Sequence, residues 1–253
     1  MKIDYPIPAL APQLVGLWKE AFGDSTEAIE GFFCTAYSPS RCRYLMDDDG
    51  RIVACLYWMD ARYRGQRFAY LYAVAVRKDC RGKGYGKLLL DDTHAHLAFR
   101  GYDGVMLYPG EESLRGYYEK FGYRTCTRVS RFTCKAAEEA AVLHRIDRDT
   151  YAALRLTYLP ETGVIQEQEN IAFLENIAFF YAGEDFVLAA STEGGKVYCP
   201  ELLGNAEAAP AIVKALRCTE GSFLTPGQDI PFAMLLPLHD QVEVPDYLGL
   251  VFN

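Results

Sequence analysis

The chain has 253 residues, half of them hydrophobic, and a formal net charge of −8 at neutral pH. This length suits one large domain or two small ones, and the net negative charge argues against nucleic-acid binding. The N-terminal residues have prolines and acids where a signal peptide would have an apolar block, and no apolar run approaches the roughly 18 residues of a membrane helix. We therefore expect a cytoplasmic protein without a membrane partner.

The first 63 residues predict two helices and a hairpin. Apolar residues at helical spacing predict helices over residues 14–22 and 27–37. Residues 41–63 predict two strands joined by a turn at residues 47–50. Three successive aspartates and a glycine in that segment favour a solvated turn over a metal site.

Two continuous apolar stretches, residues 66–77 and 104–109, are typical of strands buried in the middle of a sheet. Between them, residues 84–102 predict a helix that has Leu88 and Phe99 near its apolar face. We therefore expect a strand, a helix and a second strand in this order.

The first half then ends with a short predicted helix in residues 112–124 and an alternating segment in residues 123–134. The alternation predicts a strand or hairpin that closes the first half. A polar, alanine-rich stretch follows, so we place a boundary there. The expected domains are residues 1–134 and residues 135–253.

The second half repeats the order of elements of the first half without repeating its residues. A predicted helix is followed by a strand, an acidic turn and two further strands, and then by a helix and a strand. The corresponding segments are residues 149–159, 176–192, 195–204, 208–216 and 221–227. The apolar segments that follow, residues 231–238 and 247–253, are expected to be buried strands.

Eight cysteines occur without CxxC spacing, and most lie in apolar stretches such as VACLYW and KVYCPELL. We interpret them as reduced core thiols. His94 and His96 are two residues apart on a predicted helix, where their side chains point in different directions. We therefore expect neither a zinc site nor another metal site.

The segment before the helix of residues 84–102 is basic and rich in glycine. Residues 77–87 hold five cations against one acid, with Gly82, Gly84 and Gly86 at alternate positions. Glycines let an anion approach the backbone, and the first N–H groups of a helix have no intrahelical partner, so the segment predicts a phosphate site. The P-loop and dinucleotide patterns both fail here. The alternative interpretation is a cationic turn without a ligand.

Two motifs resemble those of the GCN5-related N-acetyltransferases (GNAT). RGKGYG at residues 81–86 matches the family pattern of Gln or Arg, two variable residues, Gly, a variable residue, and Gly or Ala. YYEKFGY at residues 117–123 is similar to the family's Y-E-K-x-G-F segment, and the resemblance covers about residues 66–134. It implies an α/β (α+β) fold with a mixed, twisted sheet and flanking helices. A second, smaller GNAT-like half would follow, as in two-half bacterial members. That half lacks both motifs, so we expect it to bind no coenzyme A.

The resemblance also implies roles for individual residues. The backbone of Val74, Ala75 and Val76 would pair with the pantetheine arm of acetyl-CoA, the expected co-substrate. Tyr118 would protonate the leaving thiolate as general acid, although its spacing alone equally fits a core aromatic residue. The pyrophosphate would be bound by Arg81, Gly82, Lys83, Gly84, Tyr85, Gly86 and Lys87.

The general base stays open. The strand of residues 66–77 carries no acid, whereas some family members have a glutamate there. The alternatives are a water chain, an acid of the first two helices, an acid after the second buried strand, or the terminal carboxylate of the chain. The residues concerned are Glu20, Asp24, Glu27, Glu30, Glu111, Glu112 and Asn253.

The expected function is acetyl transfer to a primary amine by direct attack. Negative charge on the first two helices favours a cationic small molecule or peptide as acceptor. The second half would cover the acceptor pocket, extend the sheet or mediate homo-oligomers. Because the strand acid is missing, a non-catalytic acyl-CoA sensor is the alternative. A scaffold protein that binds no ligand is a second alternative.

Overall fold

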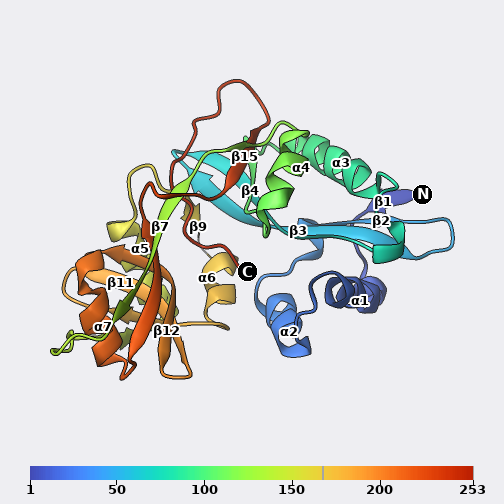
Figure 1. Ribbon diagram of the computed structural model, residues 1–253. Coiled ribbons are helices and arrows are strands. Elements are labelled where there is room, and N and C mark those ends of the chain that lie inside the picture. The colour runs from blue at the N-terminus through green and yellow to red at the C-terminus, as the bar shows by residue number, and fades with distance from the viewer. Residues whose placement is uncertain (167, 253) are drawn as a thin grey trace.

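The computed structural model describes residues 1–166 and 168–252, which form two lobes, each built on a mixed β-sheet (Figure 1). In these residues the first sheet has the order β1 (Lys2–Asp4), β2 (Cys42–Met46), β3 (Ile52–Tyr63), β4 (Gln66–Val76), β5 (Gly104–Leu107), β15 (Met234–Pro237) and β6 (Arg124–Thr125), with β9 (Ile165–Gln166) paired to β3. The second sheet has the order β14 (Ile230–Pro231), β7 (Arg128–Lys135), β13 (Glu220–Pro226), β12 (Lys196–Gly204), β11 (Phe186–Glu193), β10 (Phe179–Ala182) and β8 (His144–Ile146). The expected fold class is confirmed.

The long hairpin of β3 and β4 is the centre of the first sheet. Arg64 and Gly65 join the two strands, and both have positive φ (47° and 81°), as a two-residue hairpin turn with the twist of the strands requires. β4 and β5 run parallel, whereas the other neighbouring strands of this sheet are antiparallel. The strand, helix and strand expected in residues 66–109 are present, and α3 (Tyr85–Phe99) forms the crossover between the parallel strands.

Helices cover both faces of the first sheet (Figure 1). One face carries α1 (Ala11–Phe22) and α2 (Thr26–Thr35), and the other carries α3 (Tyr85–Phe99) and α4 (Arg115–Glu119). Because side chains alternate along a strand, Tyr57 and Tyr70 pack into the core on the side of α1, whereas Trp58 and Leu71 pack against α3. Short 3-10 helices are η1 (Pro8–Leu10), η2 (Pro39–Arg41), η3 (Lys78–Cys80) and η4 (Glu112–Leu114).

The second sheet repeats the arrangement of the first. Its parallel pair is β12 and β13, joined by η5 (Ala206–Ala208) and α7 (Ala209–Ala215), just as β4 and β5 are joined by α3. The hairpin of β10 and β11 precedes this unit, as β2 and β3 precede β4. Two further helices, α5 (Arg148–Tyr158) and α6 (Glu169–Leu174), lie before the hairpin in the chain.

The two halves exchange a strand, which differs from the expected ending of the first half. Residues 123–134 do not close the first sheet as one unit: β6 stays in that sheet, and β7 pairs with β13 in the second. In return β15 lies between β5 and β6 of the first sheet. The chain leaves the first sheet at Cys126 and Thr127, whose N–H groups donate to the carbonyl of Ala233. The expected boundary after residue 134 therefore falls inside β7.

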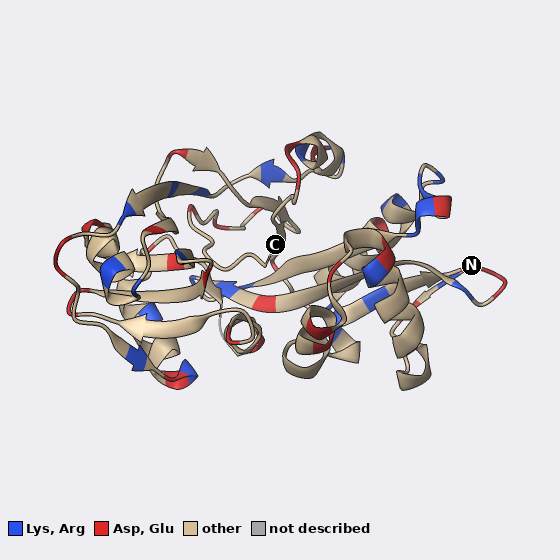
Figure 2. Ribbon diagram, turned by 60° about the horizontal axis from the view of Figure 1, so that its bottom comes forward, with Lys and Arg blue, Asp and Glu red and all other residues tan. Residues whose placement is uncertain are grey.

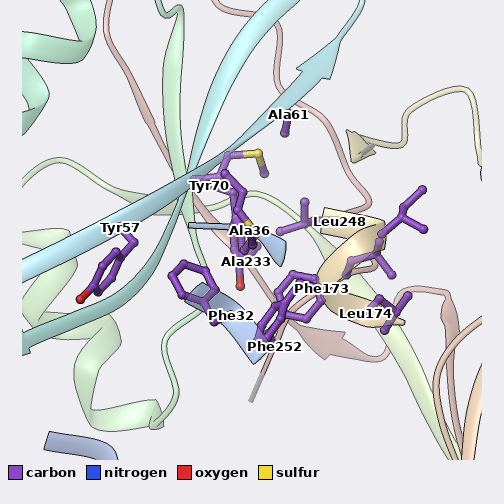
Figure 3. Packing of buried hydrophobic residues seen from close by; sticks show 14 of the residues in the cluster. Phe32, Ala36, Tyr57, Ala61, Tyr70, Phe173, Leu174, Ala233, Leu248 and Phe252 are labelled. Atoms are coloured by element: carbon purple, nitrogen blue, oxygen red, sulfur yellow. The ribbon is translucent and has the colours of Figure 1, made fainter. Parts of the chain in front are cut away.

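Two further expectations differ in detail. On α3 the buried face consists of Leu89, Leu90, Thr93 and Leu97, whereas Leu88 is 46% and Phe99 is 90% exposed. The buried face differs from the predicted one because Leu89, Leu90, Thr93 and Leu97 also recur at the three- and four-residue spacing of a helix face. Residues 247–252 are largely buried as expected but form no strand. They run into the core between the lobes, where Phe252 packs beside Phe173 of α6 (Figure 3).

Candidate active site

The parallel strands β4 and β5 separate at the middle of β4. Their pairing runs from Phe68 and Gly104 to Leu71 and Leu107, where β5 ends, while β4 continues to Val76. At this point β4 bulges: Ala73 has φ 48°, and the register with β3 shifts. The edge of β4 that follows is free of β5. It presents a row of backbone N–H and C=O groups that an extended ligand can pair with, as an added strand would.

Val74, Ala75 and Val76 lie on this free stretch, as the resemblance predicts for the strand that binds pantetheine. Ala75 and Val76 keep their pairing with β3 on the other edge, opposite Cys55 and Ala54. One edge of β4 is thus fixed in the sheet, and the other is free of β5 there, with the Val76 carbonyl accepting a hydrogen bond from Nε of Arg81 at 3.3 Å.

The glycine loop between η3 and α3 has an open backbone. Gly82 and Gly84 have φ of 76° and 81°, a region that favours glycine, and an added Cβ would meet no atom within 4 Å at either position. Gly84 precedes α3 without any side-chain cap. The first turn of α3 therefore keeps free N–H groups that can bind an anion. At Gly86 an added Cβ would come within 2.9 Å of the Tyr117 hydroxyl, so this glycine allows α4 to approach α3.

The cations of this segment fall into two groups. Arg77 binds Glu20 at 2.8 Å, and Lys87 binds Asp91 at 2.5 Å. The side chains of Lys78, Arg81 and Lys83 make no ion pair with any residue that the structure describes. Figure 2 shows basic segments in blue on both lobes, among them a projecting loop near the N-terminus. Of the three cations expected beside the phosphate, Lys87 has an acidic partner, Arg81 donates from Nε to the Val76 carbonyl at 3.3 Å, and Lys83 makes no ion pair within the described residues.

Tyr118 lies on the α3 side of the first sheet, in the same apolar cluster as Val74, Val76 and Tyr85. Its side chain is 8% exposed, and its hydroxyl has no hydrogen-bond partner among residues 1–166 and 168–252. Burial raises the pKa of Tyr118 above that of an ordinary tyrosine. The hydroxyl therefore keeps its proton at neutral pH and is a donor rather than a base.

Arg115 fixes the helix that carries Tyr118. Its guanidinium binds Glu112 at 2.8 Å and donates to the carbonyls of Pro231 and Phe232 at 2.8 and 3.0 Å. These two carbonyls belong to the segment that leads into β15. The position of Tyr118 thus depends on a contact with the exchanged strand, which the sequence motif does not reveal.

Most of the candidate general bases already form hydrogen bonds or ion pairs within the protein. Glu20 binds Arg77 and accepts from the Lys78 N–H, and Asp24 accepts from the Trp18 indole N–H at 2.7 Å. Glu111 accepts from Ser113, Glu112 binds Arg115, and Glu27 and Glu30 are exposed on α2. The carboxylate of Asn253 lies outside the described residues. On β4 itself the polar side chains facing α1 and α2 are Tyr70 and Tyr72, and burial raises the pKa of both.

A buried polar network, which sequence reasoning missed, holds the last described residues of the chain. Gln166 donates to the carbonyl of Leu250 at 2.7 Å and accepts from the Leu250 N–H at 3.0 Å. Glu201 binds Arg155 at 2.7 Å and accepts from the Tyr247 hydroxyl at 3.1 Å. The Phe252 ring consequently lies 5.9 Å from the ring of Tyr72 on β4. These polar residues are far apart in the sequence and match no motif.

A cavity of about 270 Å³ lies between the lobes, beside the end of β5. Tyr108, Phe232 and Val251 line it on the side of the first sheet, and Arg131 and Tyr198 line it on the side of the second. Tyr108 directly follows β5, at the point where β4 and β5 separate. The cavity therefore reaches the end of β5 from the side of the second lobe, and Tyr108 is the lining residue that follows that strand.

Within residues 1–166 and 168–252, no cluster of three or more His, Cys, Asp or Glu side chains is placed to hold a metal ion, and the eight cysteines are unpaired. None of the helices described is long and apolar enough to cross a membrane.

Comparisons with known proteins agree with this geometry. Residues 8–126 match the family model of the acetyltransferase (GNAT) domain. A GCN5-related N-acetyltransferase from Kribbella flavida is similar in structure, with a TM-score of 0.72 and 18% identity over 94% of this chain and 72% of that chain. So is one from Anabaena variabilis, with a TM-score of 0.71 and 14% identity over 94% and 73% of the two chains. A putative acetyltransferase from Pyrococcus horikoshii gives a TM-score of 0.66 and 15% identity over 98% and 92%. No curated protein sequence matches the chain.

Proposed function

We propose that the protein is an N-acetyltransferase, because residues 8–126 match the acetyltransferase (GNAT) domain, and that it moves the acetyl group of acetyl-CoA to a primary amine by direct attack. The observation that carries the proposal is the free edge of β4 beside the open glycine loop. The backbone of Val74, Ala75 and Val76 would bind the pantetheine arm. The N–H groups from Arg81 to Lys87, with the Arg81 and Lys83 side chains, would bind the pyrophosphate.

The proposed reaction needs one donor and one acceptor of protons. The neutral amine attacks the thioester carbonyl, a carbon–nitrogen bond forms, and the carbon–sulfur bond breaks. A backbone N–H near Val74 would stabilise the negative charge on the carbonyl oxygen. Tyr118 would give its proton to the leaving thiolate and regain one from solvent, and the proton lost by the amine would pass to water or to one of the acids discussed above.

The second half would act without binding coenzyme A. Its connection from β12 to η5 lacks the glycine loop, and Asn205 caps the turn with its own side chain at the Glu207 N–H. We propose that residues 135–253 instead complete the first sheet through β15 and form one wall of the acceptor pocket. Association of the protein into homo-oligomers through this half stays an expectation.

The first test is the turnover of a Tyr118→Phe variant. Loss of the general acid should lower kcat by about 10²–10⁴ while the affinity for acetyl-CoA stays unchanged. Tyr117→Phe is the control, because it removes a hydroxyl from the neighbouring ring and should leave kcat within a factor of about three. Free thiol release and the mass of the acetylated amine are the readouts. Equal kcat for Tyr118→Phe and wild type would remove Tyr118 from the mechanism.

The same measurement separates the enzyme from a non-catalytic acyl-CoA sensor. A sensor would bind acetyl-CoA and release no thiol in the presence of any amine of a broad panel. The free hydroxyl of Tyr118 in the apolar cluster of the β4 edge favours the enzyme.

A further inference from the structure

The cavity between the lobes has an electrostatic character that the sequence does not predict. Ten residues line it, and Arg131 is the single charged residue among them. The lining contains no acid. The remaining polar side chains are the hydroxyls of Tyr108, Tyr198 and Ser222, and the rest of the wall is apolar. The cavity therefore presents a positive charge in an otherwise apolar and hydroxylated surface.

The strand pattern of the second lobe explains why these side chains face the cavity. On β7, β12 and β13, the side chains of Phe132, Val197 and Phe223 pack against α7. The alternate side chains must point to the opposite face of the sheet, toward the first lobe. Arg131 and Leu224 are directly opposite each other on β7 and β13 and share that face.

Arg131 has no partner within the described parts of the chain. Its side chain makes no hydrogen bond and no ion pair there, and the hydroxyls of Tyr108, Tyr198 and Ser222 make no hydrogen bond there either. The other arginine near this end of β7, Arg128, donates to the carbonyl of Gln228 at 2.7 Å. The strand thus has one arginine that binds the backbone of a neighbouring segment and one, Arg131, that is exposed to solvent.

The cavity lies on the side of the first sheet from which an amine could reach the end of β5, because Tyr108 lines it. Tyr108 packs in the core on the side of α1 and α2, together with Tyr70 and Tyr72 of β4, whereas Tyr118 packs on the α3 side. An acceptor in the cavity would therefore approach the separation of β4 and β5 from the face opposite to the glycine loop and Tyr118. This is the geometry that direct attack on a thioester held between the strands requires.

We propose that this cavity binds the acceptor and that Arg131 binds an anionic group of it, so that the preferred acceptors are small primary amines that also carry a carboxylate or a phosphate. The inference rests on the proposed function. A guanidinium pairs with either anion through two parallel hydrogen bonds. The cavity, at about 270 Å³, is slightly smaller than typical small-molecule pockets, which favours an acceptor of the size of an amino acid. The acids expected to attract a cationic acceptor are less available, because Glu20 and Asp24 have partners within the protein.

Matched pairs of amines test the charge preference with little change in size. Phenylalanine is compared with 2-phenylethylamine, 5-aminopentanoate with 1,5-diaminopentane, and 2-aminoethyl phosphate with ethanolamine. The anionic member of at least one pair should have a kcat/KM about tenfold to a hundredfold higher, as expected for a hydrogen-bonded charge pair. The first two pairs test a carboxylate, and the third tests a phosphate. Equal values within all three pairs would overturn the inference and leave the acetyltransferase function intact.

Variants of Arg131 connect the preference to the residue. Arg131→Ala should abolish the preference through a higher KM with kcat nearly unchanged, and Arg131→Glu should reverse it in favour of 1,5-diaminopentane. Lys135→Glu makes the same charge change on the same strand, four residues away from Arg131, and does not line the cavity. It should leave the preference unchanged. A preference that survives Arg131→Ala contradicts the inference.

Binding of phenylacetate decides the case in which none of the six amines is acetylated. If acetyl-CoA binds and yet none of the six amines is acetylated, the result counts against the proposed function, and phenylacetate then tests the anion site separately. Calorimetry with phenylacetate, in the presence of coenzyme A, should then show one site in the wild type, and Arg131→Ala should lower its affinity at least tenfold. No binding of phenylacetate to the wild type would overturn the anion site itself.

Discussion

At the residue scale, burial decides the protonation state of the groups behind the candidate active site. His94 on α3 is hydrogen-bonded to the Tyr123 hydroxyl at 2.8 Å, and Tyr123 packs against Tyr118. Burial lowers the pKa of His94 from 6.5 to about 4, against the opposing charge of Asp91. The imidazole is therefore neutral at physiological pH. It supports the aromatic residues around Tyr118 without adding a positive charge beside them.

The lowered pKa of His94 predicts acid destabilisation. Between pH 6.5 and 4, the unfolded chain binds a proton at His94 that the folded chain does not bind, so the free energy of unfolding falls as the pH is lowered. The loss reaches roughly 3 kcal/mol at the lower end. In urea titrations at several pH values, His94→Gln should flatten this dependence. His144→Gln, on the exposed strand β8, is the control and should not. An unchanged slope for His94→Gln would place the titrating group elsewhere.

At the element scale, the exchange of β7 and β15 makes each half depend on the other. Met234 and Leu235 of β15 are buried in the first sheet, and each contributes about 1.5–3 kcal/mol by burial, a large share of the stability of a domain. Arg115 of α4 binds the segment before β15 as well. The first half is therefore incomplete without residues that come near the end of the sequence.

This dependence predicts the behaviour of the isolated first half. A chain of residues 1–134 should aggregate or stay largely unfolded and bind no acetyl-CoA, because the edge of β5 is uncovered and β7 has no partner. Circular dichroism and sedimentation measure this. Production of residues 1–134 together with residues 135–253 is the matched control and should restore binding. A soluble, monomeric chain of residues 1–134 with normal acetyl-CoA affinity would show that the exchange is dispensable.

The sequence predicts the local elements well and their long-range pairing poorly. The hairpin of β2 and β3, the basic loop before α3 and the second parallel pair have signals in adjacent residues. No signal in neighbouring residues indicates which sheet β7 joins, because an alternating strand fits the edge of either sheet. Arg131 consequently belongs to a predicted closing strand without a role, and the sequence suggests that the second half could cover the acceptor pocket without indicating which residues line it.

At the scale of the whole molecule, the two halves share a sheet topology but differ in their candidate functional residues. Both sheets contain one parallel pair with a helical crossover, yet the basic glycine loop precedes α3 alone, and the cavity with Arg131 lies against the second sheet. The first half would thus hold the acetyl donor, and the second half would help to select the acceptor. The last described residues of the chain, held by Gln166, pass between the two (Figure 3).

Titration of the whole protein with acetyl-CoA by calorimetry tests the central claim most directly. Gly84→Asp and Gly84→Asn carry the same backbone strain at φ 81°, and only the first adds a negative charge where the pyrophosphate is expected. We expect one site per chain with micromolar affinity, a modest loss of affinity for Gly84→Asn and a loss of binding for Gly84→Asp. Absence of binding to the wild type, or equal binding by the two variants, would contradict it.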